Sequence, residues 1–390
     1  MRRVWTGVVI FGIALLLLIG LRRSAVTEGG RVRGASIVDA LASDRGTDGF
    51  LRALTVCEFV FPHDAGPHPR FQTEWWYDTG NLDTSSGRHF GYQLTIFRRA
   101  LTARPVHRHV DWATSQVYFA HFCVTDVSHG RFHAAERWSR GALGLAGARA
   151  VKASPGATAG ERATSFDAWV ESWSMHREPG GSHLVARHGK VSIDLHLSPE
   201  TPPVLEGDHG LSRKSDTPGN ASYYYSLPRL RTTGTVCLGD GPMAVTGLSW
   251  LDREWSTSAL GPDETGWDWF ALQLPDGRDL MVYRLRRRDG SIDPASCGSL
   301  VAPNGNKRNL GVGDFSVVAT DHWTSPRSQA VYPSRWRVRV PAAGIDLEVV
   351  PWLRDQELPL SFVYWEGAVR VLSGGRAYGN GYVELTGYTK

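Results

Sequence analysis

The feature that most constrains the fold is a strand–turn–strand pattern rich in tryptophan. Residues 90–97 (FGYQLTIF) alternate large apolar side chains with small or polar ones. This period of two is typical of a strand whose two faces differ. The preceding run at 74–82 (EWWYDTGNL) is joined to it by the turn DTSSG, so the pair predicts a β-hairpin. Further strands are predicted at 116–127 and 191–197.

The same opening and closing patterns occur twice. Residues 266–274 (GWDWFALQL) and 280–285 (LMVYRL) predict a second tryptophan-rich hairpin. Gly-led strand pairs close both units, GTVCL with GLSWLD in the first and GAVRV with GYVELT in the second. A pattern that recurs in the same order predicts a mainly β protein with two related β-barrels or β-sandwiches in tandem. We expect their boundary in the polar, turn-rich segment 258–265.

The first residues predict a membrane anchor. Residues 4–21 (VWTGVVIFGIALLLLIGL) contain no charge and are flanked by arginine pairs. As a transmembrane helix this run would measure about 27 Å, just enough to span the bilayer core. An uncleaved signal anchor is favoured over a cleaved signal peptide, because arginines follow the run directly; a buried core helix is the third alternative. The expected organisation is an anchor or signal peptide (1–25), a tether (26–55), a first β domain (56–257) and a second (258–390).

Charge and cysteine content narrow the class of protein. The net charge of +4 is due to four arginines in the first 23 residues, without which 39 basic residues balance 39 acidic ones. A neutral body without a basic stripe argues against nucleic-acid binding. The four cysteines are widely spaced and form no C-x-x-C pair, which excludes a zinc ribbon and leaves the disulfide state open. They are Cys57, Cys123, Cys237 and Cys297.

Several longer strings resemble one protein family. They are FQTEWWYDTGNL at 71–82, YFAHF at 118–122, ASYYYS at 221–226, WLDREW at 250–255, YWEGAV at 364–369 and GYVELTGY at 381–388. In this order, over about residues 59–388, they resemble the AttH / carotenoid 1,2-hydratase-like proteins, a lipocalin-like family. The chain is most similar to its bacterial AttH-type branch, whose members are often labelled predicted secreted hydrolases.

The resemblance implies two consecutive lipocalin-like β-barrel domains, usually exported and in bacteria often associated with ABC transporters. Relatives include carotenoid 1,2-hydratases and fungal cyclases that accelerate Diels–Alder ring closures. We therefore expect an exported protein, periplasmic or extracytoplasmic, tethered to the inner membrane by residues 4–21. Its expected partners are a hydrophobic small molecule and ABC transporter components, and no cofactor is expected.

Two acids in WLDREW are the strongest candidates for chemistry. Asp252 and Glu254 lie two residues apart, so on a strand they share one face with Trp250. Burial and a neighbouring charge can raise the pKa of one such carboxyl, which could then protonate an isolated alkene while the other carboxylate holds water. The resemblance to hydratases implies the proton-donor role for Asp252. The alternative is an ion pair with Arg253 or another arginine at a barrel rim or domain junction.

His121, in YFAHF, is the third candidate catalytic residue. It is either a general base or orienting group, or a buried neutral histidine bonded to a carbonyl. His107 and His109 give only a weak zinc signal, so no metal is expected. Glu366 and Glu384, acids in apolar strands of the second unit, are expected to pair with arginine.

The candidate ligand-binding residues are aromatic side chains of these strands and one acid. They are Glu74, Trp76, Tyr77, Tyr118, Tyr223, Tyr225, Trp250, Trp255, Trp267 and Trp269. Tyr223 and Tyr225 alternate and so face together, as do Trp267 and Trp269. A barrel of about eight strands can enclose one small ligand between such walls. For the tryptophans of the two hairpins, packing between the domains is the alternative.

Two functions remain open. The preferred one is a membrane-anchored, exported lipocalin-like protein that binds a lipid- or isoprenoid-like molecule. The alternative is an acid-catalysed hydratase or cyclase acting on a carbon–carbon double bond through Asp252. A serine hydrolase is disfavoured, because the sequence has no G-x-S-x-G elbow. Asp252 in an aromatic cavity away from any arginine would favour the enzyme, whereas an arginine pair at the domain junction would favour the binding protein.

Overall fold

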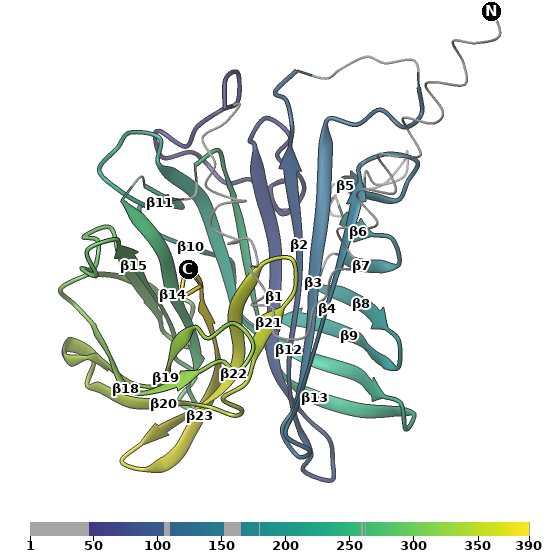
Figure 1. Cartoon of the computed structure of the whole chain (residues 1–390). Coiled ribbons are helices and arrows are strands. Elements are labelled where there is room, and N and C mark those ends of the chain that lie inside the picture. The colour runs from purple at the N-terminus through teal and green to yellow at the C-terminus, as the bar shows by residue number, and fades with distance from the viewer. Residues whose placement is uncertain are drawn as a thin grey trace, which may run out of the picture. The chain divides into compact units, whose positions relative to one another are not determined.

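The computed structural model describes residues 47–104, 110–151, 165–178, 180–258, 260–261 and 263–389. In this part of the chain the regular structure is almost entirely β (Figure 1). Two short 3-10 helices, η1 (His63–Ala65) and η2 (Pro341–Ala343), accompany two antiparallel sheets. The mainly β fold predicted from the alternating strands is confirmed.

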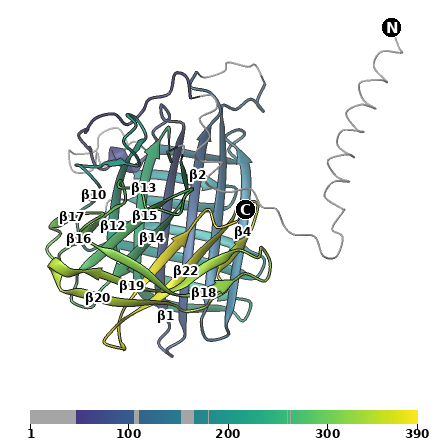
Figure 2. The same ribbon diagram turned by 60° about the vertical axis from the view of Figure 1, so that its left-hand side comes forward.

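The first sheet contains thirteen strands. They are β1 (Thr73–Asp83), β2 (His89–Ala100), β3 (Gln116–Asp126), β4 (Arg131–Arg140), β5 (Ala146–Val151), β6 (Ser165–Val170), β7 (Trp173–Glu178), β8 (Gly181–His188), β9 (Val191–Pro199), β10 (Val204–Leu205), β11 (Leu211–Arg213), β12 (Ala221–Leu238) and β13 (Pro242–Ser256). Their order is β4-β3-β2-β1-β13-β12-β9-β8-β7-β6-β5, and β10 and β11 pair with β12. Figure 2 shows β6 to β9 running across β1 to β4, and β3 lies close to β5 and β6, so this sheet is barrel-like and nearly closed.

The second sheet contains ten strands. They are β14 (Glu264–Gln273), β15 (Asp279–Arg287), β16 (Cys297–Val301), β17 (Lys307–Gly311), β18 (Ser316–Thr324), β19 (Val331–Val340), β20 (Ile345–Pro351), β21 (Glu357–Pro359), β22 (Val363–Ser373) and β23 (Arg376–Leu385). Their order is β17-β16-β15-β14-β23-β22-β20-β19-β18, and β21 pairs with β22. The chain passes between the sheets after Ser256 and before Glu264. That each sheet is a separate domain stays a prediction.

Buried apolar side chains form three clusters. One fills the inside of the first sheet and contains Trp76 and Leu195; a second fills the inside of the second sheet and contains Trp336. The third contains residues of both sheets, among them Tyr77 and Trp269, and therefore lies between them. We call this third layer the seam. The inside of each sheet is occupied by its own side chains, which fill the place where the sequence predicted a ligand.

The seam is tight where β2 meets β22. A Cβ atom added to Gly91 would lie 2.3 Å from the Cβ atom of Ala368, far inside van der Waals contact. The two sheets can approach this closely because Gly91 has no side chain.

The predicted anchor cannot be compared with the structure, because residues 4–21 and the first part of the tether, 26–46, lie outside the described residues. Within the described ranges no helix is both long and apolar enough to cross a membrane. The four cysteines are all free thiols, and Cys123 is buried.

Candidate functional site

A small cavity lies in the seam. It contains about 70 Å³ of space that the centre of a water molecule can reach. Its apolar wall is formed by Trp75, Tyr77, Phe97, Trp267, Trp269 and Leu285. Its polar wall is formed by Asp252, Glu254, Glu384, Lys214 and Tyr224. A mostly aromatic cavity with a few convergent polar groups has the character of a small-molecule site.

Two equivalent strand pairs supply the acids of this cavity. In the first sheet β1 pairs with β13, and Tyr77 lies directly opposite Asp252. In the second sheet β14 pairs with β23, and Trp269 lies directly opposite Glu384. Each pair joins the first strand of the tryptophan-rich hairpin to the Gly-led strand that closes the unit. The repeat seen in the sequence therefore places one aromatic–acid pair in each wall of the seam.

Asp252 is buried, with 5% of its surface exposed, and is held by three donors. Its Oδ2 accepts a hydrogen bond from the Tyr224 hydroxyl at 2.6 Å. Its Oδ1 accepts from the Ser226 hydroxyl at 2.6 Å and from the Trp250 indole N–H at 2.7 Å. Burial outweighs these donors and, with a contribution from the Glu254 charge, raises the pKa of Asp252 to about 7. A carboxyl with this pKa can both donate and accept a proton near neutral pH.

Asp252 lacks the arginine partner that the alternative interpretation required. Among the described residues it takes part in no ion pair, and the neighbouring Arg253 points to the other face of the strand, where it pairs with Glu74. On the cavity side, the Trp269 indole N–H donates to the Tyr224 hydroxyl oxygen at 3.3 Å. This bond connects the second sheet to the group that holds Asp252.

Glu384 is the second acid without a cationic partner. Burial raises its pKa to about 8; a hydrogen bond with Trp267 opposes the shift, and the charge of Asp252 adds to it. Glu366 lies opposite Glu384, on β22. Burial and the Glu384 charge raise the pKa of Glu366 well above its usual range. Glu366 accepts a hydrogen bond from the Tyr77 hydroxyl at 2.9 Å. The expected pairing of Glu366 and Glu384 with arginine is wrong, since neither joins an ion pair within the described ranges.

Glu254 differs from Asp252, although both line the cavity. The Lys214 ammonium lies 3.2 Å from a Glu254 carboxylate oxygen, and both side chains are nearly buried. The same ammonium donates to the Ser212 hydroxyl and stands 4.6 Å from the ring centre of Tyr283. Glu254 is thus paired with a lysine, not with the arginine considered from the sequence, and it marks the charged end of the cavity.

Of the ten predicted ligand-binding residues, Tyr77, Trp267 and Trp269 line the cavity and Trp250 bonds to Asp252. The other six belong to the inside of the first sheet, on the opposite face of their strands. They are Glu74, Trp76, Tyr118, Tyr223, Tyr225 and Trp255.

Glu74 is the charged centre of that interior. It is fully buried and ion-paired with Arg98 and Arg253, which are themselves fully buried. Burial alone would raise the pKa of Glu74, but the two guanidinium charges hold it well below its usual range. The guanidinium of Arg253 also stands 4.1 Å from the ring centre of Trp76. This cluster stabilises the first sheet and does not reach the cavity.

His121 lies in the seam but outside the cavity. Its Nδ1 is 2.7 Å from the Tyr364 hydroxyl, not bonded to a carbonyl as the structural alternative supposed. Burial lowers its pKa to about 4, so the ring is neutral near pH 7. His121 therefore connects β3 to β22 across the seam.

Sequence reasoning missed Tyr224, Ser226, Glu384 and Lys214 as site residues. Tyr224 lies between Tyr223 and Tyr225, the two tyrosines predicted to bind the ligand. The register of β12 against β13 determines which of the three side chains faces the cavity. In that register Ser226 lies opposite Asp252 and Tyr224 opposite Glu254, so both face the cavity. Only the pairing of β12 with β13 identifies Tyr224 and Ser226 as site residues, and the sequence alone does not reveal that pairing.

One group of side chains among the described residues has the spacing of metal ligands: His183, Asp194 and His196. It lies on β8 and β9, outside the cavity. His107 and His109 lie outside the described residues.

Comparison with known proteins agrees with this architecture. A family model described as AttH-like matches residues 52–388. The chain is 33% identical to a protein from Nitrosomonas europaea provisionally assigned as AttH, with a TM-score of 0.76 over 87% of this chain and 100% of that one. No match is found among curated proteins.

Two further solved structures share the fold at low identity. Kievitone hydratase from Nectria haematococca is 16% identical, with a TM-score of 0.60 over 87% of this chain and 97% of that one. CghA, solved with Sch210972, is 12% identical, with a TM-score of 0.52 over 90% of this chain and 97% of that one. From the family match over most of its length, together with the Nitrosomonas relative, the chain belongs to the AttH-like family.

Proposed function

We propose that this protein is an acid–base enzyme that adds water to a carbon–carbon double bond of an apolar small molecule. The observation that carries the proposal is the state of Asp252: a carboxyl buried in an aromatic cavity, without a cation, with its pKa raised to about 7. Near neutral pH a large fraction of such a group is protonated, and a protonated acid is what an unactivated alkene requires.

The reaction uses residues that already meet at the cavity. The proton of Asp252 forms a bond to one alkene carbon with the π electron pair, which leaves a cation on the other carbon. The rings of Tyr77 and Trp269 lie where they can stabilise that cation. A water oxygen then bonds to the cation and gives its proton to a carboxylate, for which Glu254, ion-paired with Lys214, is placed in the cavity wall. Tyr224, Ser226 and Trp250 stabilise the Asp252 carboxylate that remains.

This proposal reverses the preference drawn from the sequence. The carrier interpretation expected a cavity inside a barrel, whereas the cavity around Asp252 lies in the seam. An arginine partner would have weakened the enzyme interpretation, and Asp252 joins no ion pair within the described residues. A hydratase among the proteins of the same fold supports the enzyme, although the likeness itself extends only to the fold. Export, tethering to the inner membrane and association with an ABC transporter stay proposals drawn from the sequence.

The test is Asp252→Asn, assayed in D2O with kievitone, geraniol and farnesol as alkene probes. Mass spectrometry should detect a product heavier by one D2O, with one deuterium fixed on carbon. We expect Asp252→Asn to lower its formation by at least about 100-fold, as loss of a general acid does.

The matched control is Asp78→Asn. Asp78 is also buried, and burial raises its pKa to about 7, but it lies opposite Leu251 and so faces the inside of the first sheet. Its variant should retain turnover. Wild-type turnover in Asp252→Asn would refute the proton-donor role, and tight binding of the probes without conversion would favour the carrier.

A further inference from the structure

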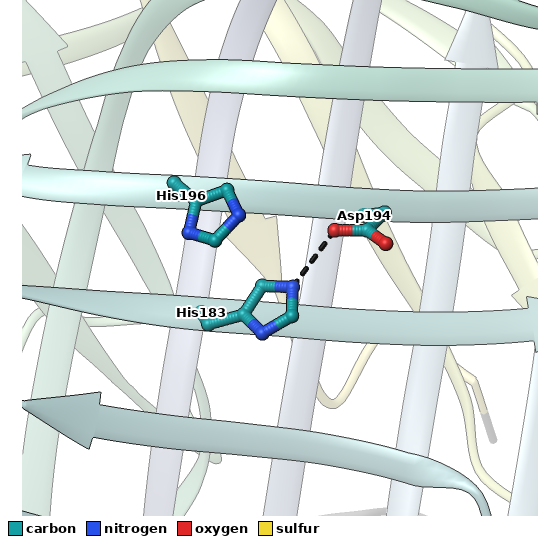
Figure 3. Close-up of side chains that lie close together, drawn as sticks. All are labelled: His183, Asp194 and His196. Atoms are coloured by element: carbon teal, nitrogen blue, oxygen red, sulfur yellow. Dashed lines mark hydrogen bonds and ion pairs between the residues drawn. The ribbon is translucent and has the colours of Figure 1, made fainter.

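The outer face of β8 and β9 carries a cluster of histidines that the proposed reaction does not use. His183 on β8 and His196 on β9 are direct cross-strand partners. Asp194 lies two residues before His196, so both side chains are on the same face of β9. The alternate residues Ile193 and Leu195 are buried in the core, which places Asp194 and His196 on the outer face. Figure 3 shows the two imidazole rings and the carboxylate gathered over these two strands.

The three side chains already have the arrangement of a ligand set. The His183 and His196 rings are stacked, with centroids 4.3 Å apart and planes 3° apart. His183 Nε2 lies 2.7 Å from Asp194 Oδ1. One ligand atom from each of the three residues lies within 4.8 Å of the others. Two ligands of a tetrahedral zinc ion are about 3.4 Å apart, so small side-chain rotations would bring the atoms into place.

His176, on the neighbouring strand β7, is not available as a fourth metal ligand. His176 on β7 is the cross-strand partner of His183 on the other side. Both of its ring nitrogens are engaged, Nδ1 by Asp167 and Nε2 by Glu178 at 3.0 Å. By contrast, no side-chain hydrogen bond is present at His196 within the described ranges, so both of its ring nitrogens can reach a ligand.

We propose that His183, Asp194 and His196 form a surface site for a divalent transition-metal ion of the zinc class. Two imidazoles and a carboxylate are ligands that suit Zn²⁺, Ni²⁺ and Cu²⁺, and three protein ligands leave a position for water. The ion would take the place of the proton between His183 and Asp194. This site is independent of the proposed hydratase activity, since β8 and β9 supply no side chain to the wall of the cavity in the seam.

The sequence predicted no metal because His107 and His109, the pair considered there, gave only a weak zinc signal. Here the ligands are brought together by the β8–β9 register, which joins residues eleven or more positions apart. An ion bound to both strands would hold them together and stabilise the folded state by an amount that grows with the logarithm of its affinity.

The test is zinc titration of the full-length chain, purified without a polyhistidine tag and stripped with a chelator. Isothermal titration calorimetry should find one Zn²⁺ per chain. His196→Ala and Asp194→Asn should each weaken binding by at least about tenfold, the loss that follows even when an outer partner of a ligand is removed. Co²⁺ should give visible absorption bands of a low-coordinate site in the wild type and not in the variants.

The matched control is His188→Ala, at the exposed end of β8. It should bind Zn²⁺ as the wild type does. The thermal unfolding midpoints of all variants without metal should stay near that of the wild type, because the substituted side chains are largely exposed, and added Zn²⁺ should raise the midpoint only where the site is intact. A wild type that binds no more zinc than His196→Ala, or an equal loss in His188→Ala, would overturn the proposal.

Discussion

Asp252→Asn should make the folded protein more stable, by an amount that grows with pH. An asparagine side chain has nearly the shape of aspartate, and its amide oxygen can accept the hydrogen bonds of Ser226 and Trp250. Its amide N–H can donate to the Tyr224 oxygen, which bonds to Asp252 in the wild type. The substitution therefore keeps the packing and removes the buried charge.

The magnitude follows from the pKa of Asp252 in the two states. In the unfolded chain the pKa is 3.8, and in the folded protein burial raises it to about 7. Because the folded state holds the proton more tightly, stability falls as pH rises between these values, by about 1.4 kcal/mol per pH unit. Below the lower value both states are protonated and there is no effect; above the upper value the loss is complete at about 4 kcal/mol. Asparagine does not titrate, so the variant avoids this loss.

Urea unfolding followed by tryptophan fluorescence measures the effect. The difference in unfolding free energy, variant minus wild type, should grow by about 2.6 kcal/mol between about pH 5 and about pH 8. Taking the difference cancels the titration of the groups that do not interact with Asp252. The denaturant dependence of the two proteins should be equal, which shows that the substitution leaves the folded and unfolded states otherwise unchanged.

Asp346→Asn is the control of opposite sign. Its hydrogen bonds with Arg337 lower the pKa of the exposed Asp346 to about 2. A lowered pKa contributes stability above the unfolded value and loses it as pH falls, so this variant should be slightly less stable than the wild type near neutral pH. A difference for Asp252→Asn that is flat or falls with pH would refute the argument that this carboxyl is destabilised by burial, and with it the basis of the proposed acid.

Two further predictions concern the framework. Glu74→Gln leaves the fully buried Arg98 and Arg253 without their shared carboxylate, and should lower the unfolding free energy by about 3–5 kcal/mol in urea titrations; a loss below about 1 kcal/mol would contradict the ion-pair assignment. Gly91→Ala forces a methyl group against Ala368 and should cost about 1–3 kcal/mol, whereas the double variant with Ala368→Gly should recover most of it; no recovery would show that the seam is not in contact there.

The period of two in the sequence predicted the strands and the shared face of Trp250, Asp252 and Glu254, and this grouping is what the structure has. It could not decide which face meets the second sheet. On β1, Trp76 and Tyr77 are both buried, one inside the first sheet and one in the seam. When both faces of a strand are apolar, the alternation of side chains shows that there are two faces, but it does not show which face packs inside its own sheet and which packs against the other sheet.

The rest of the site depends on pairings between distant strands. Glu384 and Asp252 line the same cavity because β23 and β13 are the closing strands of two sheets that pack together. The sequence alone does not show which strands of the two sheets pack together. Tyr224 was passed over for the same reason, since only the β12–β13 register distinguishes it from Tyr223 and Tyr225. His183 and His196 likewise become neighbours only through the folding of β8 against β9.

The two aromatic–acid pairs, Tyr77 with Asp252 and Trp269 with Glu384, occupy equivalent positions in the two sheets, each between the first hairpin strand and the closing strand. In the proposed reaction, this repeated arrangement would offer an elongated substrate two head-to-tail orientations, in which opposite acids would approach opposite faces of the same double bond. The ammonium–carboxylate pair of Lys214 and Glu254 has no counterpart two residues beyond Glu384, where Thr386 bonds to backbone. A polar head group on the guest would therefore choose the orientation, and with it the handedness of the product.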